Sequence, residues 1–270
     1  MDTNTLADYL KDRRSKLDPA AFGFSLTRRR TPGLRREEVA QRANVSATWY
    51  TWLEQGRGGT PSADVLDRLA YALTLTEVER EHLFLLAQQR PPQVQFREAE
   101  RITPQLQRVL DSLECSPALV RTAAWDVIAW NRAAATIMGD YSALSLQERN
   151  VLRLIFTDPN AKTRMLDWEK EARNAVAGFR ADTVRAGASE RVTALVEELS
   201  RVSGEFASMW RIHDVRSYGS GTKLMRHAIA GVVTFEYSSF SVDGRPDLGL
   251  VIFTPATPDD AERIRALLTK

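Results

Sequence analysis

The sequence is poor in cysteine, with Cys115 as its single thiol among 270 residues. One cysteine cannot close an internal disulfide or build a cysteine-based zinc cluster, which fits a reducing compartment. No run of about 18 apolar residues occurs, and the first residues lack the apolar segment of a signal peptide. We therefore expect a cytoplasmic protein that does not bind a membrane.

Motifs of catalysis and cofactor binding are also missing. The sequence has no glycine-rich phosphate loop, no nucleophile elbow and no histidine or carboxylate pair at metal-ligand spacing. His213 and His227 have no carboxylate or cysteine partner at such spacing, so structural histidines are the better interpretation than metal or haem ligands. These absences predict a protein that is not an enzyme and that holds no metal or cofactor.

Charge is nearly balanced in total but uneven along the chain. The formal net charge is +2, too small by itself to indicate a nucleic-acid partner. Between Leu26 and Arg36, however, five arginines and no acid occur. We expect a locally positive surface near residue 30.

The length and the change in sequence character predict two domains. Up to residue 90 the apolar residues fall at helical spacing in five segments, which predicts an all-α domain. Pro91, Pro92 and Pro104 mark residues 91–104 as a linker. Residues 105–270 contain two short apolar runs, several helical segments, three runs rich in β-branched and aromatic residues, and a last helix over 259–268. They predict an α+β domain with an antiparallel five-stranded sheet.

One stretch of the first domain, "RREEVAQRANVSATWYTWLEQGRG" at residues 35–58, has a helical apolar rhythm that breaks once, around Asn44. Its apolar residues can share one small core only if two short helices meet at a sharp turn, which is the arrangement of a helix-turn-helix. Ala40 is small enough for the second helix to cross it, and Asn44 tolerates positive φ. Ser46 can cap the second helix, which we expect to end near Gly56.

These residues carry a family resemblance. The stretch "TPGLRREEVAQRANVSATWYTWLEQGRG", followed by "PSADVLDRLAYAL", resembles the XRE/Cro-type helix-turn-helix of the MmyB-like transcription regulators. "MWRIHDVR", "LMRHAIAG" and "LGLVIFTP" resemble the C-terminal PAS-like domain of the same family, although His227-Ala228 stands where the family often has His-Pro. The resemblance implies a lambda-repressor-like DNA-binding domain and a ligand-binding sensor domain.

Docking of such a motif places its second helix in the major groove of a double-stranded DNA operator. The candidates for base contact are Ser46, Ala47, Thr48, Trp49 and Thr51, although Ser46 is at least as well explained as a cap alone. The candidates for phosphate contact are Arg28, Arg29, Arg30, Arg35, Arg36 and Arg57, of which the first three could equally form a solvated basic loop. Symmetric operators imply a homodimer.

Aromatic residues dominate the predictions for the second domain. The candidate pocket residues are Trp125, Trp130, Phe179, Trp210, Phe235 and Tyr237, with Arg180 and His213 as polar groups. Each aromatic residue is individually explained by a place in the core, and only the resemblance suggests a cavity. The scarcity of charge in "AIAGVVTFEY" favours a small apolar, fatty-acid-like ligand. The alternative is a domain that serves dimerisation or recruits a protein partner and holds no small molecule.

Overall fold

The computed structural model describes residues 5–27, 29, 32–92, 102–186, 190–216 and 218–269. The chain separates into two compact units, one that ends at Pro92 and one that starts at Gln93. Each unit is treated on its own below. Most of the expected linker, 91–104, lies outside the described residues, so the division into 1–90, 91–104 and 105–270 stays a prediction.

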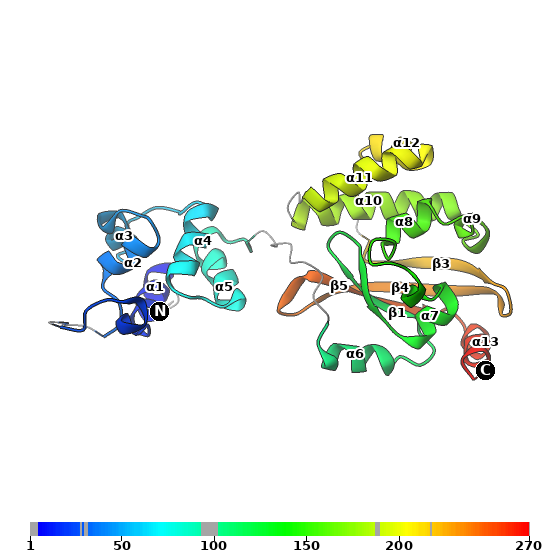
Figure 1. The fold of residues 1–270 in the computed structure, drawn as a ribbon, viewed down its shortest axis with the longest axis horizontal. Helices are drawn as coiled ribbons and strands as arrows, with labels where there is room; N and C mark the ends of the chain where they lie inside the picture. Colours follow the sequence, from blue (N-terminus) through cyan, green and yellow to red (C-terminus); the bar gives the residue numbers. More distant parts are fainter. Residues whose placement is uncertain are drawn as a thin grey trace. The chain divides into compact units, whose positions relative to one another are not determined.

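The first unit is helical, as expected from its apolar spacing (Figure 1). Its elements are α1 (Leu6–Ser15), the 3-10 turn η1 (Pro19–Phe22), α2 (Arg36–Arg42), α3 (Ala47–Leu53), α4 (Ala63–Ala72) and α5 (Glu77–Gln88). Serine or threonine caps begin four of the five α-helices, because their side-chain oxygens accept backbone N–H groups that have no helical partner. At α5, Thr76 and Glu79 form the capping box that the sequence predicts.

The turn between α2 and α3 has the predicted geometry. Asn44 adopts a φ of 51°, and the Val45 N–H donates to the Ala40 carbonyl at 2.9 Å. Ala40 is 1% exposed under the crossing helix. Ser46 accepts a hydrogen bond from the Trp49 N–H at 3.3 Å, so it caps α3. These local contacts fix the angle between the two helices around a core that includes Tyr50.

The second unit is built on one antiparallel sheet of five strands. The strands are β1 (Ala118–Thr122), β2 (Val127–Trp130), β3 (Ser220–His227), β4 (Gly231–Val242) and β5 (Arg245–Pro255), in the order β2-β1-β5-β4-β3. The helices are α6 (Pro104–Asp111), α7 (Arg132–Met138), η2 (Tyr141–Ala143), α8 (Val151–Phe156), α9 (Ala161–Arg164), α10 (Trp168–Ala186), α11 (Glu190–Val202), α12 (Gly204–Arg211) and α13 (Pro258–Leu268). This is the predicted α+β unit with an antiparallel five-stranded sheet.

The two faces of the sheet carry different cores. On one face, Leu119, Phe235 and Phe253 pack with residues of α7 and α13, and the aromatic cluster around Trp125 and Phe179 lies beyond them among α8 and α10–α12. On the other face a smaller cluster packs against Leu110 of α6. Figure 1 shows α10–α12 and α6 on opposite sides of the sheet. The first face is therefore the thicker layer, and it holds the cavity described below.

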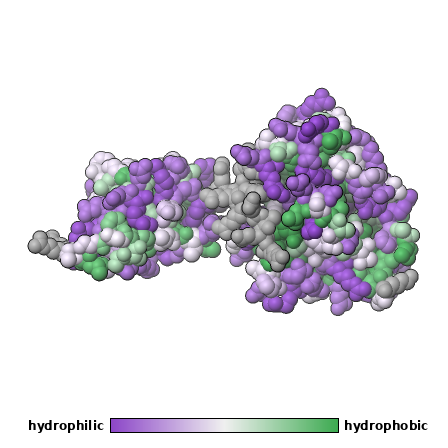
Figure 2. All heavy atoms as spheres, in the orientation of Figure 1, coloured by the Kyte–Doolittle hydropathy of each residue, from purple (hydrophilic) through white to green (hydrophobic). Residues whose placement is uncertain are grey.

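The visible surface of each unit is mostly hydrophilic, with smaller hydrophobic patches (Figure 2). Among the residues that the structure describes, no helix combines the length and apolarity needed to cross a bilayer.

Candidate functional sites

The outward face of α3 begins with three residues that have short side chains. Ser46, Ala47 and Thr48 are exposed, as their predicted base contacts require. Thr51 is half-buried, and its hydroxyl donates to the Ala47 carbonyl at 2.8 Å. The hydroxyl oxygen can still accept a hydrogen bond from a base, and the Thr51 methyl group can still contact one. The half-buried Trp49 packs against the core of the unit. The base-contact assignments stay predictions.

Sequence reasoning missed two residues on this face. Trp52 is 51% exposed and Gln55 is also exposed. Trp52 lies in line with Thr48 at the i, i+4 spacing of one helix face, opposite the buried Tyr50, and Gln55 follows two residues after α3 ends at Leu53. The sequence did contain a signal for Trp52. Tyr50 and Leu53 are predicted core residues, so the residue four positions after Thr48 is expected on the opposite, exposed face.

The arginines near residue 30 differ in their surroundings. Arg28 and Arg30 lie outside the described residues. The Arg29 guanidinium donates to both carboxylate oxygens of Glu38, at 2.7 and 3.0 Å, and to the carbonyls of Gly33 and Ser25, both at 2.9 Å. Its side chain is 10% exposed. Arg29 therefore holds the loop before α2, and this geometry argues against the predicted phosphate contact.

A buried carboxylate links the three helices of this surface. Glu54 follows α3 and is fully buried, and it accepts hydrogen bonds from Arg14 Nε of α1 at 2.6 Å and from Arg36 Nε of α2 at 2.7 Å. Burial raises the pKa of the Glu54 carboxyl, but its hydrogen bonds to the two arginines outweigh burial and hold the pKa below its ordinary value. Glu54 therefore stays charged and fixes Arg36 beside α3.

Positive charge outweighs negative charge around α3. The Arg36 side chain is 44% exposed and Arg57 is also exposed, whereas Glu54, the one acid among residues 43–60, is buried. Arg35 occupies the N-cap position of α2, and its exposed side chain lies 3.6 Å from the exposed carboxylate of Glu37. Residues 43–60 thus present exposed positive charge and no exposed acid, which suits an anionic duplex.

The second unit contains an apolar cavity of about 70 Å³ between the sheet and its thicker helical layer. Fourteen residues line it, namely Leu119, Arg121, Met138, Tyr141, Val151, Leu154, Ile155, Arg164, Met165, Tyr218, Lys223, Met225, Val251 and Phe253. Three of them are basic and none is acidic. The cavity is smaller than the sites of about 300–1,000 Å³ that usually hold drug-sized ligands. A ligand must therefore widen it, and its three methionines are side chains that adapt readily.

Two of the basic side chains in this wall have nitrogens without a hydrogen-bond acceptor among the described residues. Arg121 is 5% exposed and donates from Nη2 to Asp182 at 3.1 Å, while its Nε and Nη1 are buried without a partner. The Lys223 ammonium makes no hydrogen bond to another described residue, and it lies 5.7 Å from the centre of the Phe253 ring. Burial lowers the pKa of Lys223, and the nearby Glu171 only partly opposes this. Unsatisfied buried donors are costly, so each calls for an acceptor.

Comparison with known families matches both units. Residues 5–83 match a helix-turn-helix domain, and residues 102–267 match the MmyB-like transcription regulator ligand binding domain. The chain belongs to the MmyB-like transcription regulators. No curated protein matches it. Membership confirms the resemblance found in the sequence and identifies a DNA-binding regulator, not an enzyme, with a separate ligand-binding domain.

In this MmyB-like regulator, none of the eight residues predicted for the pocket belongs to the lining of the cavity. Four aromatic residues stand directly behind lining residues: Trp125 and Tyr237 contact Tyr218, Phe235 contacts Phe253, and Trp130 contacts Tyr141. Phe179 and Trp210 belong to the cluster around α10 and α12. Arg180 bonds the carbonyls of Trp210 and Asp214, and His213 is exposed with a φ of 59°.

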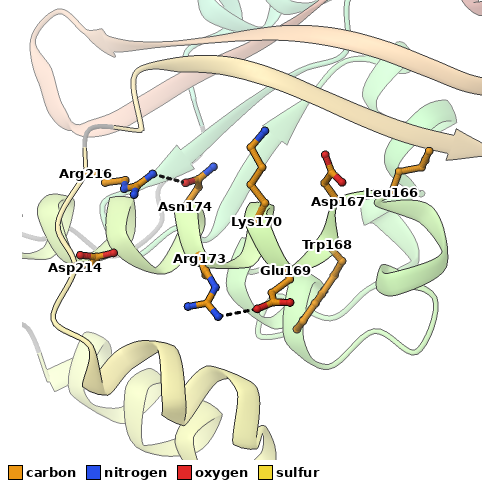
Figure 3. A pocket seen from close by; sticks show the side chains of 9 residues that line it. All are labelled: Leu166, Asp167, Trp168, Glu169, Lys170, Arg173, Asn174, Asp214 and Arg216. Carbon is orange, nitrogen blue, oxygen red and sulfur yellow. Dashed lines mark hydrogen bonds and ion pairs between the residues drawn. The ribbon is translucent and has the colours of Figure 1, made fainter.

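A larger groove along α10 is a poorer match to an apolar ligand. It measures about 550 Å³ and is lined by nine residues, shown in Figure 3, of which three are acidic and three basic. Arg173 pairs with Glu169 at 2.6 Å, and Arg216 donates to Asn174 at 3.4 Å. Charges of both signs line this open groove, in contrast to the inner cavity, which has basic side chains and no acidic one.

Histidine and cysteine add no further site. His213 is exposed. The Nδ1 of His227 accepts the N–H groups of Ile229 and Ala230 in a turn. Within the described part of the chain, no group of three or more metal-ligating side chains occurs. Cys115 is half-buried and reduced.

Proposed function

We propose that this regulator binds its operator through the outward face of α3 and senses an apolar molecule that carries one acidic group. The base-reading residues would be Ser46, Ala47, Thr48 and Thr51. Arg36 and Arg57 would contact phosphates on either side of them, with Arg35 at the start of α2. This division assigns affinity to the arginines and sequence choice to α3.

The class of ligand rests mainly on one observation. The cavity wall is apolar except for three basic side chains and the hydroxyls of Tyr141 and Tyr218. Arg121 Nε and Nη1 are buried without acceptors, and Lys223 Nζ makes no hydrogen bond to a described residue. A carboxylate supplies acceptors and negative charge together, while a hydrocarbon chain fits the leucine, methionine and valine wall. A fatty-acid-like molecule combines both properties.

Calorimetry with decanoate and decanol tests this proposal, because the two molecules share a chain and differ in the acidic group. We expect decanoate to bind tighter by at least ten-fold, and we expect Lys223→Met to remove most of that difference. Lys162→Met is the matched control, since Lys162 lies outside the cavity with its side chain 60% exposed. Equal binding of the two molecules by the unaltered protein would contradict the proposed class.

The ligand would control DNA binding by favouring one arrangement of a homodimer. An effector can shift an equilibrium only by its differential affinity for two states, so operator affinity must change when decanoate is added. A symmetric operator would engage two copies of α3, one helical turn apart. Light scattering of the chain alone and on a selected operator duplex measures the stoichiometry, and a one-to-one complex would refute the dimer.

A further inference from the structure

Trp52 is an exposed aromatic side chain on the helix that faces DNA. Its indole ring makes no ring or cation contact with another described residue, although the next residue, Leu53, is 2% exposed. A single exposed hydrophobic residue needs no special explanation on an ordinary surface. On α3 the position is different, because this face lies in the matched helix-turn-helix and residues 43–60 carry the exposed Arg57 but no exposed acid.

The neighbours of Trp52 limit what the helix can reach. Ala47 and Thr48 have short side chains, and the Thr51 hydroxyl already donates within the helix. The Trp52 indole ring is the largest apolar group among the exposed side chains of α3. In the major groove, the one apolar feature of the bases is the 5-methyl group of thymine.

We propose that Trp52 reads thymine by packing its indole ring on the 5-methyl group of a base in each half-site. The inference rests on the proposed docking of α3 and adds a specificity residue that sequence reasoning did not assign. Gln55, two residues past the end of α3, would then lie nearer the phosphate-contacting Arg57.

Replacement of thymine by uracil isolates the methyl group without altering any base-pairing edge. The operator is first selected from random duplex DNA by the full chain, and each thymine is then replaced by uracil in turn. We expect one or two positions per half-site at which uracil weakens binding about four-fold, the equilibrium equivalent of burying one methyl group. With Trp52→Ala, the same replacements should leave affinity unchanged.

Two further variants keep the result unambiguous. Trp52→Phe retains an apolar ring and should retain part of the uracil penalty, and it replaces Trp52→Ala if the latter no longer binds DNA. Tyr71→Ala is the matched control, because Tyr71 is an aromatic residue that is 79% exposed on α4, away from this face. It should keep the full penalty.

The possible failures separate cleanly. If the unaltered chain selects no operator, the proposed docking fails together with the inference. If the chain binds its operator and the uracil penalty is equal in Trp52→Ala and the unaltered protein, the thymine contact is wrong while DNA binding stands. If Trp52→Ala also binds the operator with normal affinity, the exposed indole ring does not contact DNA, and it either contacts a protein partner or contacts nothing.

Discussion

Lys223→Met should make the ligand-free protein more stable while weakening its ligand. Lys223 is 7% exposed in an apolar wall, without a hydrogen bond to a described residue. Burying a polar group without a compensating hydrogen bond costs about 1–3 kcal/mol, and an apolar side chain of similar volume removes that cost. Because Glu171 stays behind and is also buried, we expect the lower part of that range, about 1–2 kcal/mol in the free energy of unfolding.

The effect should depend on pH in a defined direction. Burial lowers the pKa of Lys223 in the folded state, so the unfolded chain binds more protons between that lowered value and about 10.4. The stability of the unaltered protein therefore rises with pH through this window. Lys223→Met lacks this contribution, and its stability advantage should be largest at neutral pH and should shrink toward pH 10.

Other charged and titratable groups near Lys223 also affect the expected change in stability. Arg121, Arg164 and Tyr218 share the cavity wall, and burial raises the pKa of Glu171, which favours its neutral form once the ammonium is gone. The assay is thermal unfolding of the ligand-free chain at several pH values, where 1 kcal/mol corresponds to about 2–4 °C for a unit of this size. Lys162→Met should shift the midpoint little, since its ion pair is exposed. A clear loss of stability in Lys223→Met at neutral pH, or an advantage independent of pH, would refute the reasoning.

Three further outcomes follow from the first unit. Arg36→Ala should weaken binding to all DNA sequences alike and reduce the slope of log affinity against log salt by about 1, which titrations at several salt concentrations measure; an unchanged slope would remove the phosphate contact. Ala in place of Thr48 or Thr51 should cost more on the selected operator than on random duplex, and equal losses would exclude base reading. Gly33→Ala should lower the unfolding midpoint far more than Gly59→Ala: both positions have positive φ, but a Cβ at Gly33 would lie 2.3 Å from the Arg14 carbonyl oxygen, whereas Gly59 has open space.

The helix-turn-helix could be predicted because its signals are local. Asn44 provides the turn, Ser46 provides the cap, and Thr76 with Glu79 begins α5, each through contacts within a few residues. The five strands could also be predicted, because their segments are apolar or rich in β-branched and aromatic residues. Local signals did not show which arginines are free to meet DNA, since Arg29 is held by Glu38, nine residues further along.

The cavity was harder to find because its wall is assembled from distant segments. Arg121 lies on β1, Arg164 is the last residue of α9, and Lys223 lies on β3. A usable signal was present in the strands, where side chains alternate between faces. Lys223 shares its face with the buried Met225, and Arg121 shares its face with the buried Leu119. A charged residue two positions from a core residue in a strand lies on the same face and is therefore expected to be buried. The aromatic residues, in contrast, indicated only where the core lies, and not the lining of the cavity.

The two walls of the cavity differ in how they can yield to a ligand. The sheet wall is held by long ladders, in which β4 and β5 pair in unbroken register from Phe235 to Ser241. The helical wall includes α8 and α9, which are six and four residues long and which single backbone hydrogen bonds, at Val151 and Leu166, join to neighbouring segments. A cavity of about 70 Å³ must widen on the weaker side, so α8 and α9 should move while the sheet keeps its register. Hydrogen exchange with and without decanoate should change protection in α8 and α9 and leave β4 and β5 unaltered; the reverse pattern would place the moving wall in the sheet.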